Sequence, residues 1–130
     1  MQKLIIITFF ISVFVYNAEA QYSGQSGLNF LEGEWVLDMS PQDSSDSNFA
    51  KMTINSIDNG QLKGFFYRDG VEIRNAQINQ QTKRLYCALI SGDGTGEYYT
   101  TFYLENGKLY GTTHSRERNF LSVWVGRKVQ

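Results

Sequence analysis

Residues 97–114 read EYYTTFYLENGKLYGTTH, two runs of alternating side chains joined by Asn106-Gly107. An Asn-Gly pair accepts positive φ at both central positions of a two-residue turn, which makes it the strongest short hairpin signal. The turn places Glu105 opposite Lys108 on one face of the hairpin. On the other face Leu104 lies opposite Leu109. The stretch therefore predicts an antiparallel hairpin with one apolar face.

Two further turns set the register of the preceding strands. Asp69-Gly70 predicts a two-residue turn, which would place Phe66 opposite Ile73. Residues 58–60 (DNG) predict a three-residue loop, which would align Met52 with Phe66 and Ile54 with Gly64. Each pairing puts apolar or small side chains on a shared face.

The same alternation extends through most of the chain and is broken by Gly-containing turns and by the polar loop Pro41–Asn48. Eight strands are expected, at about 31–39, 49–57, 61–68, 71–79, 84–90, 97–105, 108–114 and 120–127. Hairpins in sequence form an up-and-down antiparallel meander. Closing the meander removes both exposed edges, so the predicted fold is all-β, an eight-stranded up-and-down barrel.

The inner face of this barrel collects most of the large apolar side chains. The register assigns to it Leu37, Met52, Ile54, Leu62, Phe66, Ile73, Phe102, Leu104, Leu109 and Trp124, with small residues Gly64, Thr100, Gly111, Thr113 and Ser122. An eight-stranded barrel is either filled by its own side chains or holds one small ligand. The hypothesis is a small apolar ligand near Phe66, Phe102, Thr113 and Trp124; a filled core is the alternative.

The outer face of the last three strands is rich in tyrosine. Tyr99, Tyr103, Tyr110 and His114 share it, together with threonines and aliphatic residues of the final strand. Such a face would suit self-association or a protein partner. Because both faces of these strands are apolar, the reverse assignment of inside and outside also stays open.

The first 20 residues have the pattern of a secretory signal peptide. Lys3 precedes the uncharged apolar run 4–16, and Ala18-Glu19-Ala20 fits a cleavage site that ends at Ala20. Residues 21–30 are polar and Gly/Ser-rich, which predicts a flexible leader before one domain over 31–130. The expected location is periplasmic or secreted, with no membrane anchor after signal cleavage.

Composition and motifs argue against several function classes. The net charge of −1 without a basic cluster makes nucleic-acid binding unlikely by sequence. One histidine, His114, and one cysteine, Cys87, do not suffice for a metal site. Cys87 is expected as a buried thiol, with an intermolecular disulfide as the alternative. No Gly-x-Ser-x-Gly elbow or catalytic relay is found, so the prediction is a non-enzyme without cofactor or metal.

The turn after the seventh strand carries Arg116 and Arg118 around Glu117. It is expected to be solvated. The alternative is that the two arginines, beside His114, hold an anion at the mouth of the barrel.

Two short motifs give the chain a resemblance to a known superfamily. Gly33-Glu34-Trp35 opens the first strand, and residues 124–128 (WVGRK) end the last. In this the chain resembles the calycins, which include lipocalins, fatty-acid-binding proteins and avidins. The resemblance implies that Trp35 closes one end of the barrel under a basic residue, Arg127 or Lys128, in a cation–π contact.

Within the calycins, residues 52–67 (MTINSIDNGQLKGFFY) look most like the second and third strands of avidins. Gly64-Phe65-Phe66 stands where avidins have Gly-x-Tyr. Residues 36–39 (VLDM) lack the polar side chains that avidins present to biotin, so no biotin site is carried over.

Two functions follow from the sequence. The first is an exported binding module for a small hydrophobic or amphipathic ligand inside the barrel. The second is a protein that acts through its surface, as an oligomer through the tyrosine-rich face or as a secreted enzyme inhibitor. Small calycin-like barrels that inhibit secreted proteases give the inhibitor its precedent by resemblance.

Overall fold

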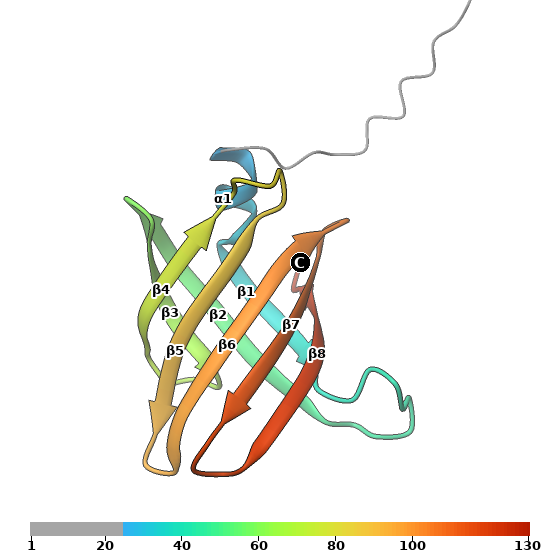
Figure 1. Ribbon diagram of the computed structural model, residues 1–130. Helices are drawn as coiled ribbons and strands as arrows, with labels where there is room; N and C mark the ends of the chain where they lie inside the picture. Colours follow the sequence, from blue (N-terminus) through green and yellow to red (C-terminus); the bar gives the residue numbers. More distant parts are fainter. Residues whose placement is uncertain (1–24) are drawn as a thin grey trace, which may run out of the picture.

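The computed structural model describes residues 25–130 and shows one helix and eight strands (Figure 1). Their bounds are α1 Gln25–Leu31, β1 Gly33–Asp38, β2 Phe49–Asp58, β3 Gln61–Tyr67, β4 Ile73–Asn79, β5 Tyr86–Asp93, β6 Gly96–Glu105, β7 Lys108–Ser115 and β8 Phe120–Lys128. The predicted signal peptide and residues 21–24 lie outside this range. Within it, no helix has the length and apolar character needed to cross a membrane.

All strands pair antiparallel in one sheet, in the order β3-β2-β1-β8-β7-β6-β5-β4. The first and last strands of the chain therefore lie side by side, and the two edges of the sheet are β3 and β4. These edges meet through one bridge between Phe65 and Glu72 and a hydrogen bond from Phe66 N to Val71 O of 2.9 Å. The sheet is a nearly closed up-and-down barrel, which confirms the predicted fold class.

The Asn106-Gly107 hairpin has the predicted register. Both residues have positive φ, 50° and 74°, and Glu105 pairs with Lys108 while Leu104 pairs with Leu109. The side-chain alternation from this turn fixes which face of β6, β7 and β8 points inward. Leu104, Leu109 and Trp124 are buried, so the reverse assignment is excluded.

The turn between β2 and β3 differs from its prediction, although the predicted pairs Met52–Phe66 and Ile54–Gly64 are confirmed. The turn has two residues, Asn59 and Gly60, both with positive φ, rather than three. A bulge between Ile54 and Ser56 takes up the extra residue and restores the register.

The register predicted for β3 and β4 is wrong by two residues. Phe65, not Phe66, bridges this pair, and its partner is Glu72. Val71 N donates to Arg68 O at 3.3 Å, which closes a turn around Asp69 and Gly70 as predicted, but Phe66 N donates to Val71 O at 2.9 Å, so the pairing outside this turn is shifted. Tyr67 sits at this turn with its ring against that of Tyr98, at 5.2 Å between centroids. A slip of two residues leaves every side chain on its face, so the predicted inner set is unaffected.

The barrel interior is packed. All ten large residues predicted to point inward are buried, and Leu31, Trp35, Ala76, Leu85, Cys87 and Leu89 join them in one core. Trp124 lies at its centre, with ring centroids 6.1 Å from Phe66 and 6.0 Å from Phe102. Its Nε1 donates to Thr113 Oγ1 at 3.0 Å, and Thr113 and Thr100 hydroxyls are 2.9 Å apart.

Gly111 makes room for this tryptophan. A Cβ on Gly111 would lie 2.6 Å from Cη2 of Trp124, well inside van der Waals contact. The indole therefore lies directly against the β7 backbone, where any larger residue would displace it.

One end of the barrel is closed by helix α1 (Figure 1). Leu31 is fully buried, Leu28 packs on the core, and Trp35 Nε1 donates to Leu31 O at 2.9 Å. The prediction of a flexible leader is thus wrong for residues 25–30. A helix this short is stabilised by packing rather than by propensity, and its leucines cover the core at the barrel end.

The basic residue over this closed end is Lys128. Its Nζ lies 4.5 Å from the ring centroid of Phe30 and 5.9 Å from that of Trp35, and it donates to Phe30 O. The assignment of Arg127 to barrel closure is wrong. Arg127 pairs across the ladder with Val36 and Lys108 and is exposed, because neighbouring residues of a strand point to opposite faces.

Cys87 is buried in β5 with 1% of its surface exposed. Burial raises the pKa of its thiol from 9.0 to about 12. The thiolate is therefore suppressed and the sulfur shielded, which fits the buried-thiol interpretation rather than an intermolecular disulfide.

We predict that Gly111→Ala destabilises the protein by about 1–3 kcal/mol through displacement of Trp124. The matched control is Gly94→Ala, since no atom lies within 4 Å of a Cβ at Gly94. Its effect should stay within about 0.5 kcal/mol. Urea unfolding followed by tryptophan fluorescence measures both. Equal stability of the two variants would contradict the close approach of Trp124 to β7.

Cys87 gives a pH dependence with a defined sign. Between pH 9 and about 12 the folded state keeps a thiol proton that the unfolded state releases, so stability falls as pH rises. Cys87→Ala removes this contribution, and its free energy of unfolding should fall less steeply, by up to about 1.4 kcal/mol per pH unit. Urea unfolding of both proteins from pH 8 to 11 gives the slopes. Parallel slopes would show that Cys87 ionises equally in both states.

Candidate functional site

The barrel end opposite α1 holds a pocket of about 310 Å³. In Figure 1 this is the end with the β5–β6 and β7–β8 turns and the loop between β1 and β2. Most lining side chains are aromatic or aliphatic, and the lining residues come from five strands and two loops. They are Met39, Asn48, Phe49, Ala50, Phe66, Tyr67, Tyr98, Thr113, Arg118, Phe120, Leu121 and Ser122.

The floor of this open-end pocket is the packed core. Of the four predicted ligand-binding residues, Phe66 and Thr113 line the pocket. Trp124 lies one layer deeper, in ring contact with Phe66 and hydrogen-bonded to Thr113. Phe102 lies behind Trp124 and is not part of the lining. The pocket is therefore shallow and ends at the Phe66–Trp124 contact.

The pocket wall includes residues that the sequence analysis did not single out as ligand contacts. Tyr98 is fully buried, with its ring 5.2 Å from Tyr67 and 6.1 Å from Phe120. Its position follows from alternation, because Tyr98 has the same parity in β6 as Thr100 and Phe102. Tyr67 could not be found in this way, since its place depends on the turn between β3 and β4.

Arg118 extends from the β7–β8 turn to the pocket wall. Its Nη1 donates to Tyr98 Oη at 3.0 Å and to Tyr67 Oη at 3.4 Å, and its guanidinium lies 5.4 Å from the ring of Phe120. These phenol contacts raise the pKa of Arg118 further above its usual range, with the Tyr98 contact contributing most. The backbone N–H of Arg118 donates to Ser115 Oγ at 3.3 Å, which fixes the turn.

Behind Tyr98 the polar contacts continue to the β5–β6 turn, which carries Asp93 and Thr95. The Tyr98 hydroxyl lies 3.4 Å from both carboxylate oxygens of Asp93 and 3.0 Å from Thr95 Oγ1. The hydroxyl and N–H of Thr95, and then Arg68, hold the pKa of Asp93 below its usual value. Arg68 pairs with Asp93 at 2.9 Å. Three turns of the open end are thus linked through one carboxylate and two arginines.

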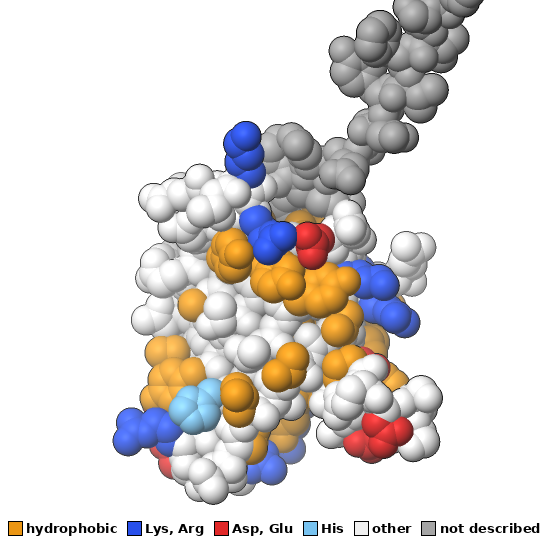
Figure 2. All heavy atoms as spheres, turned by 45° about the vertical axis from the view of Figure 1, so that its right-hand side comes forward, with side chains coloured by type: hydrophobic (Ala, Val, Ile, Leu, Met, Phe, Trp, Pro, Cys, Tyr) orange, Lys and Arg blue, Asp and Glu red, His pale blue; other side chains and the backbone are white. Residues whose placement is uncertain are grey.

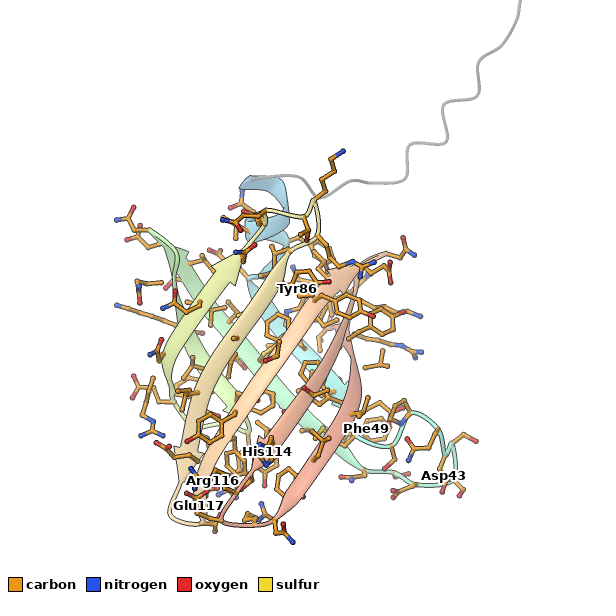
Figure 3. The ribbon with its side chains drawn as sticks, in the orientation of Figure 1. Asp43, Phe49, Tyr86, His114, Arg116 and Glu117 are labelled. Atoms are coloured by element: carbon orange, nitrogen blue, oxygen red, sulfur yellow. The ribbon has the colours of Figure 1, made fainter. Side chains whose placement is uncertain are left out.

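The predicted interface residues lie on the outer surface. The Tyr103 and Tyr110 rings stack at 5.4 Å and 19°, Tyr86 lies 5.8 Å from Tyr103, and Arg84 lies 4.6 Å above the Tyr103 ring. Tyr86 stands on β5 near the closed end in Figure 3. A shallow groove of about 320 Å³ runs beside these rings.

Toward the open end the same surface carries Tyr99 and His114, with ring centroids 6.5 Å apart. Leu121 and Val123 of β8 are 67% and 60% exposed. Figure 2 shows the pale-blue His114 ring on this surface, among orange hydrophobic side chains. The outer face of β5–β8 is therefore apolar and aromatic over most of its length.

His114 and Arg116 do not join the pocket. His114 belongs to the outer face of β7, and Figure 3 places it with Arg116 and Glu117 on the outside of the barrel. Of the three basic residues considered for an anion at the mouth, only Arg118 lines the pocket. Among residues 25–130, no three His, Cys, Asp or Glu side chains cluster in a geometry that could hold a metal ion.

Comparisons with protein-family models, with curated proteins and with solved structures give no match to this chain.

Proposed function

We propose that this chain is a calycin-like binding protein that takes a small apolar or amphipathic molecule into the open-end pocket. One observation carries the proposal. The barrel is plugged by α1 at one end, while the other end has a pocket with aromatic walls and one cationic side chain, Arg118. Concave apolar sites with few polar groups are typical of small-molecule binding.

The size of the pocket favours short ligands. Its volume of about 310 Å³ is at the lower limit of the range of about 300–1,000 Å³ for small-molecule sites. An alkyl chain of seven methylenes would gain roughly 5 kcal/mol on full burial, from which the cost of association is subtracted. Affinities in the millimolar range or weaker are therefore expected for a ligand that binds by apolar contact alone.

Binding rather than catalysis fits the chemistry of the pocket. Its polar groups are the Thr113 and Ser122 hydroxyls, the amide of Asn48, two phenols and the Arg118 guanidinium. Serine, histidine and acid do not meet here, because His114 is on the outer face. The proposed location, periplasmic or secreted after cleavage at Ala20, is supported by the sequence of residues 1–20.

A second candidate function is supported by the outer face of β5–β8. Leu121 and Val123 are exposed next to the tyrosine row, as expected for self-association or for an inhibitor that docks on an enzyme. Sedimentation velocity over a 100-fold concentration range, at about 1 to 100 μM where weak dimers form, tests the self-association form. A dimer would support it, and a monomer at every concentration would contradict it.

The pocket proposal is tested by filling the pocket. Ala50 lies on its wall, so Ala50→Phe should occupy the space and weaken binding of 1-octanol at least about tenfold. The matched control is Ala88→Phe, because Ala88 is exposed on β5 outside the pocket. NMR titration with 1-octanol reports the site and the affinity.

The wild-type shifts should map to residues around Phe66, Tyr98 and Phe120. Both variants should unfold cooperatively, which separates loss of the pocket from loss of the fold. No detectable shift in the wild type up to saturation with 1-octanol, or shifts confined to the outer face of β5–β8, would contradict the proposal.

A further inference from the structure

We infer that the outer face of β6–β8 is a docking surface for a lipid bilayer that contains anionic phospholipid. Two observations lead to this inference. The centre of the face is apolar and exposed on β8, and its margin carries two cations that no carboxylate of the described chain neutralises. The face belongs to the outside of the barrel wall, so the inference does not depend on ligand binding in the open-end pocket.

The outer side chains of β8 change from apolar to basic along the strand. Leu121, Val123 and Val125 are followed by Arg127, since every second residue of a strand points to the same face. Leu121 and Val123 are 67% and 60% exposed, the most of any large hydrophobic side chains among residues 25–130. Exposed apolar groups beside basic groups are the combination by which amphipathic elements bind at membrane surfaces.

Two tyrosines extend the apolar row across the neighbouring strands. Val125 of β8 pairs with Tyr110 of β7, and Tyr110 pairs with Tyr103 of β6. Tyrosine is enriched at membrane–water interfaces because its ring is apolar and its hydroxyl is polar. Figure 2 shows orange hydrophobic side chains across this face, with blue cations near its margins.

Lys108 and Arg127 bring two positive charges together at the margin of the face. They are directly opposite each other in the β7–β8 ladder, which places their Cβ atoms about 5 Å apart. Glu105, which is opposite Lys108 on β6, pairs with Arg84 at 2.8 Å instead. Among residues 25–130, no ion pair joins Lys108 or Arg127 to Asp or Glu. Like charges in this position destabilise a sheet, and a bound lipid phosphate would offset that repulsion.

The charge of the margin favours a bilayer over a second copy of the chain. A two-fold dimer brings the same patch of both copies together, so it would add the two cations of each copy to one interface. An anionic bilayer supplies the opposite charge, and its acyl boundary accepts Leu121 and Val123. The loop that carries Asp43 protrudes beyond Phe49 in Figure 3, so its acidic side chains limit the contact to the β6–β8 side.

Cosedimentation with vesicles tests the inference, using the chain from Gln21 onward, which contains the whole described barrel and lacks the apolar run 4–16. One set of vesicles holds equal parts phosphatidylglycerol and phosphatidylcholine, and the other holds phosphatidylcholine alone. The wild type should bind the anionic vesicles at least about tenfold more strongly. Added salt should weaken this binding, because it screens the charges.

Removal of the two cations should weaken binding to the anionic vesicles. Lys108→Gln combined with Arg127→Gln should lower it about 30-fold, since each basic residue at such a surface contributes about fivefold. The matched control is Lys63→Gln combined with Lys83→Gln, which makes the same change in net charge at exposed positions on β3 and in the β4–β5 turn. The control should stay within about threefold of the wild type, because its charges lie away from the bilayer.

A carboxylate in the apolar centre should have a similar effect. Val123→Asp should lower binding at least about tenfold, through loss of apolar contact and repulsion by the phosphates. Gln61→Asp is its matched control, since Gln61 is exposed at the start of β3. Cooperative urea unfolding of all four variants separates loss of the surface from loss of the fold.

The outcomes separate this inference from the proposed function. No binding to anionic vesicles, equal binding to both kinds of vesicle, or equal losses in a variant and its control would overturn the inference. A dimer that does not bind vesicles would overturn it in favour of self-association. Lys108 and Arg127 do not line the open-end pocket, so 1-octanol should bind their double variant as it binds the wild type. Failure of vesicle binding with 1-octanol binding intact would leave the pocket proposal standing.

Discussion

The contact of Trp124 with Gly111 is the constraint on which the barrel interior depends. Because residue 111 has no side chain, the indole lies across β7, donates to Thr113 and touches Phe66 on β3 and Phe102 on β6. One side chain of β8 thus joins four strands from different parts of the sheet. It also fills the centre of the barrel, and the open-end pocket lies above it.

The two barrel ends differ because only one of them has an element to cover it. At the closed end α1 buries Leu31, and Lys128 lies over the aromatic pair Phe30 and Trp35. At the open end, turns alone surround the rim, and Arg118 reaches across it from one of them. A domain of this size without a disulfide depends on core packing for its stability. A shallow pocket at the rim therefore lowers the free energy of unfolding less than a cavity through the centre of the barrel would.

Much of the fold could be predicted because it follows from local rules. Asn106-Gly107 fixes one hairpin, and side-chain alternation extends its register to the ten inward residues. The errors lie where tertiary contacts decide. At the end of β3, where the register differs, the ring of Tyr67 packs against Tyr98, and at the closed end of the barrel α1 packs Leu31 into the core. In the site, Phe66 and Thr113 were found by alternation, whereas the place of Arg118 depends on how a turn folds back.

The filled core also bears on selectivity. If the pocket binds a ligand as proposed, its aromatic floor at Phe66 and Trp124 would limit the distance between the polar head of that ligand and the end of its tail. Arg118 defines the other end of that distance, since Tyr98 and Tyr67 hold its guanidinium at the rim. Tyr98 is in turn held by the Asp93 turn, which Arg68 links to the β3–β4 turn. Loosening either turn would therefore change the position of the Arg118 guanidinium, and with it the distance from this cation to the floor of the pocket.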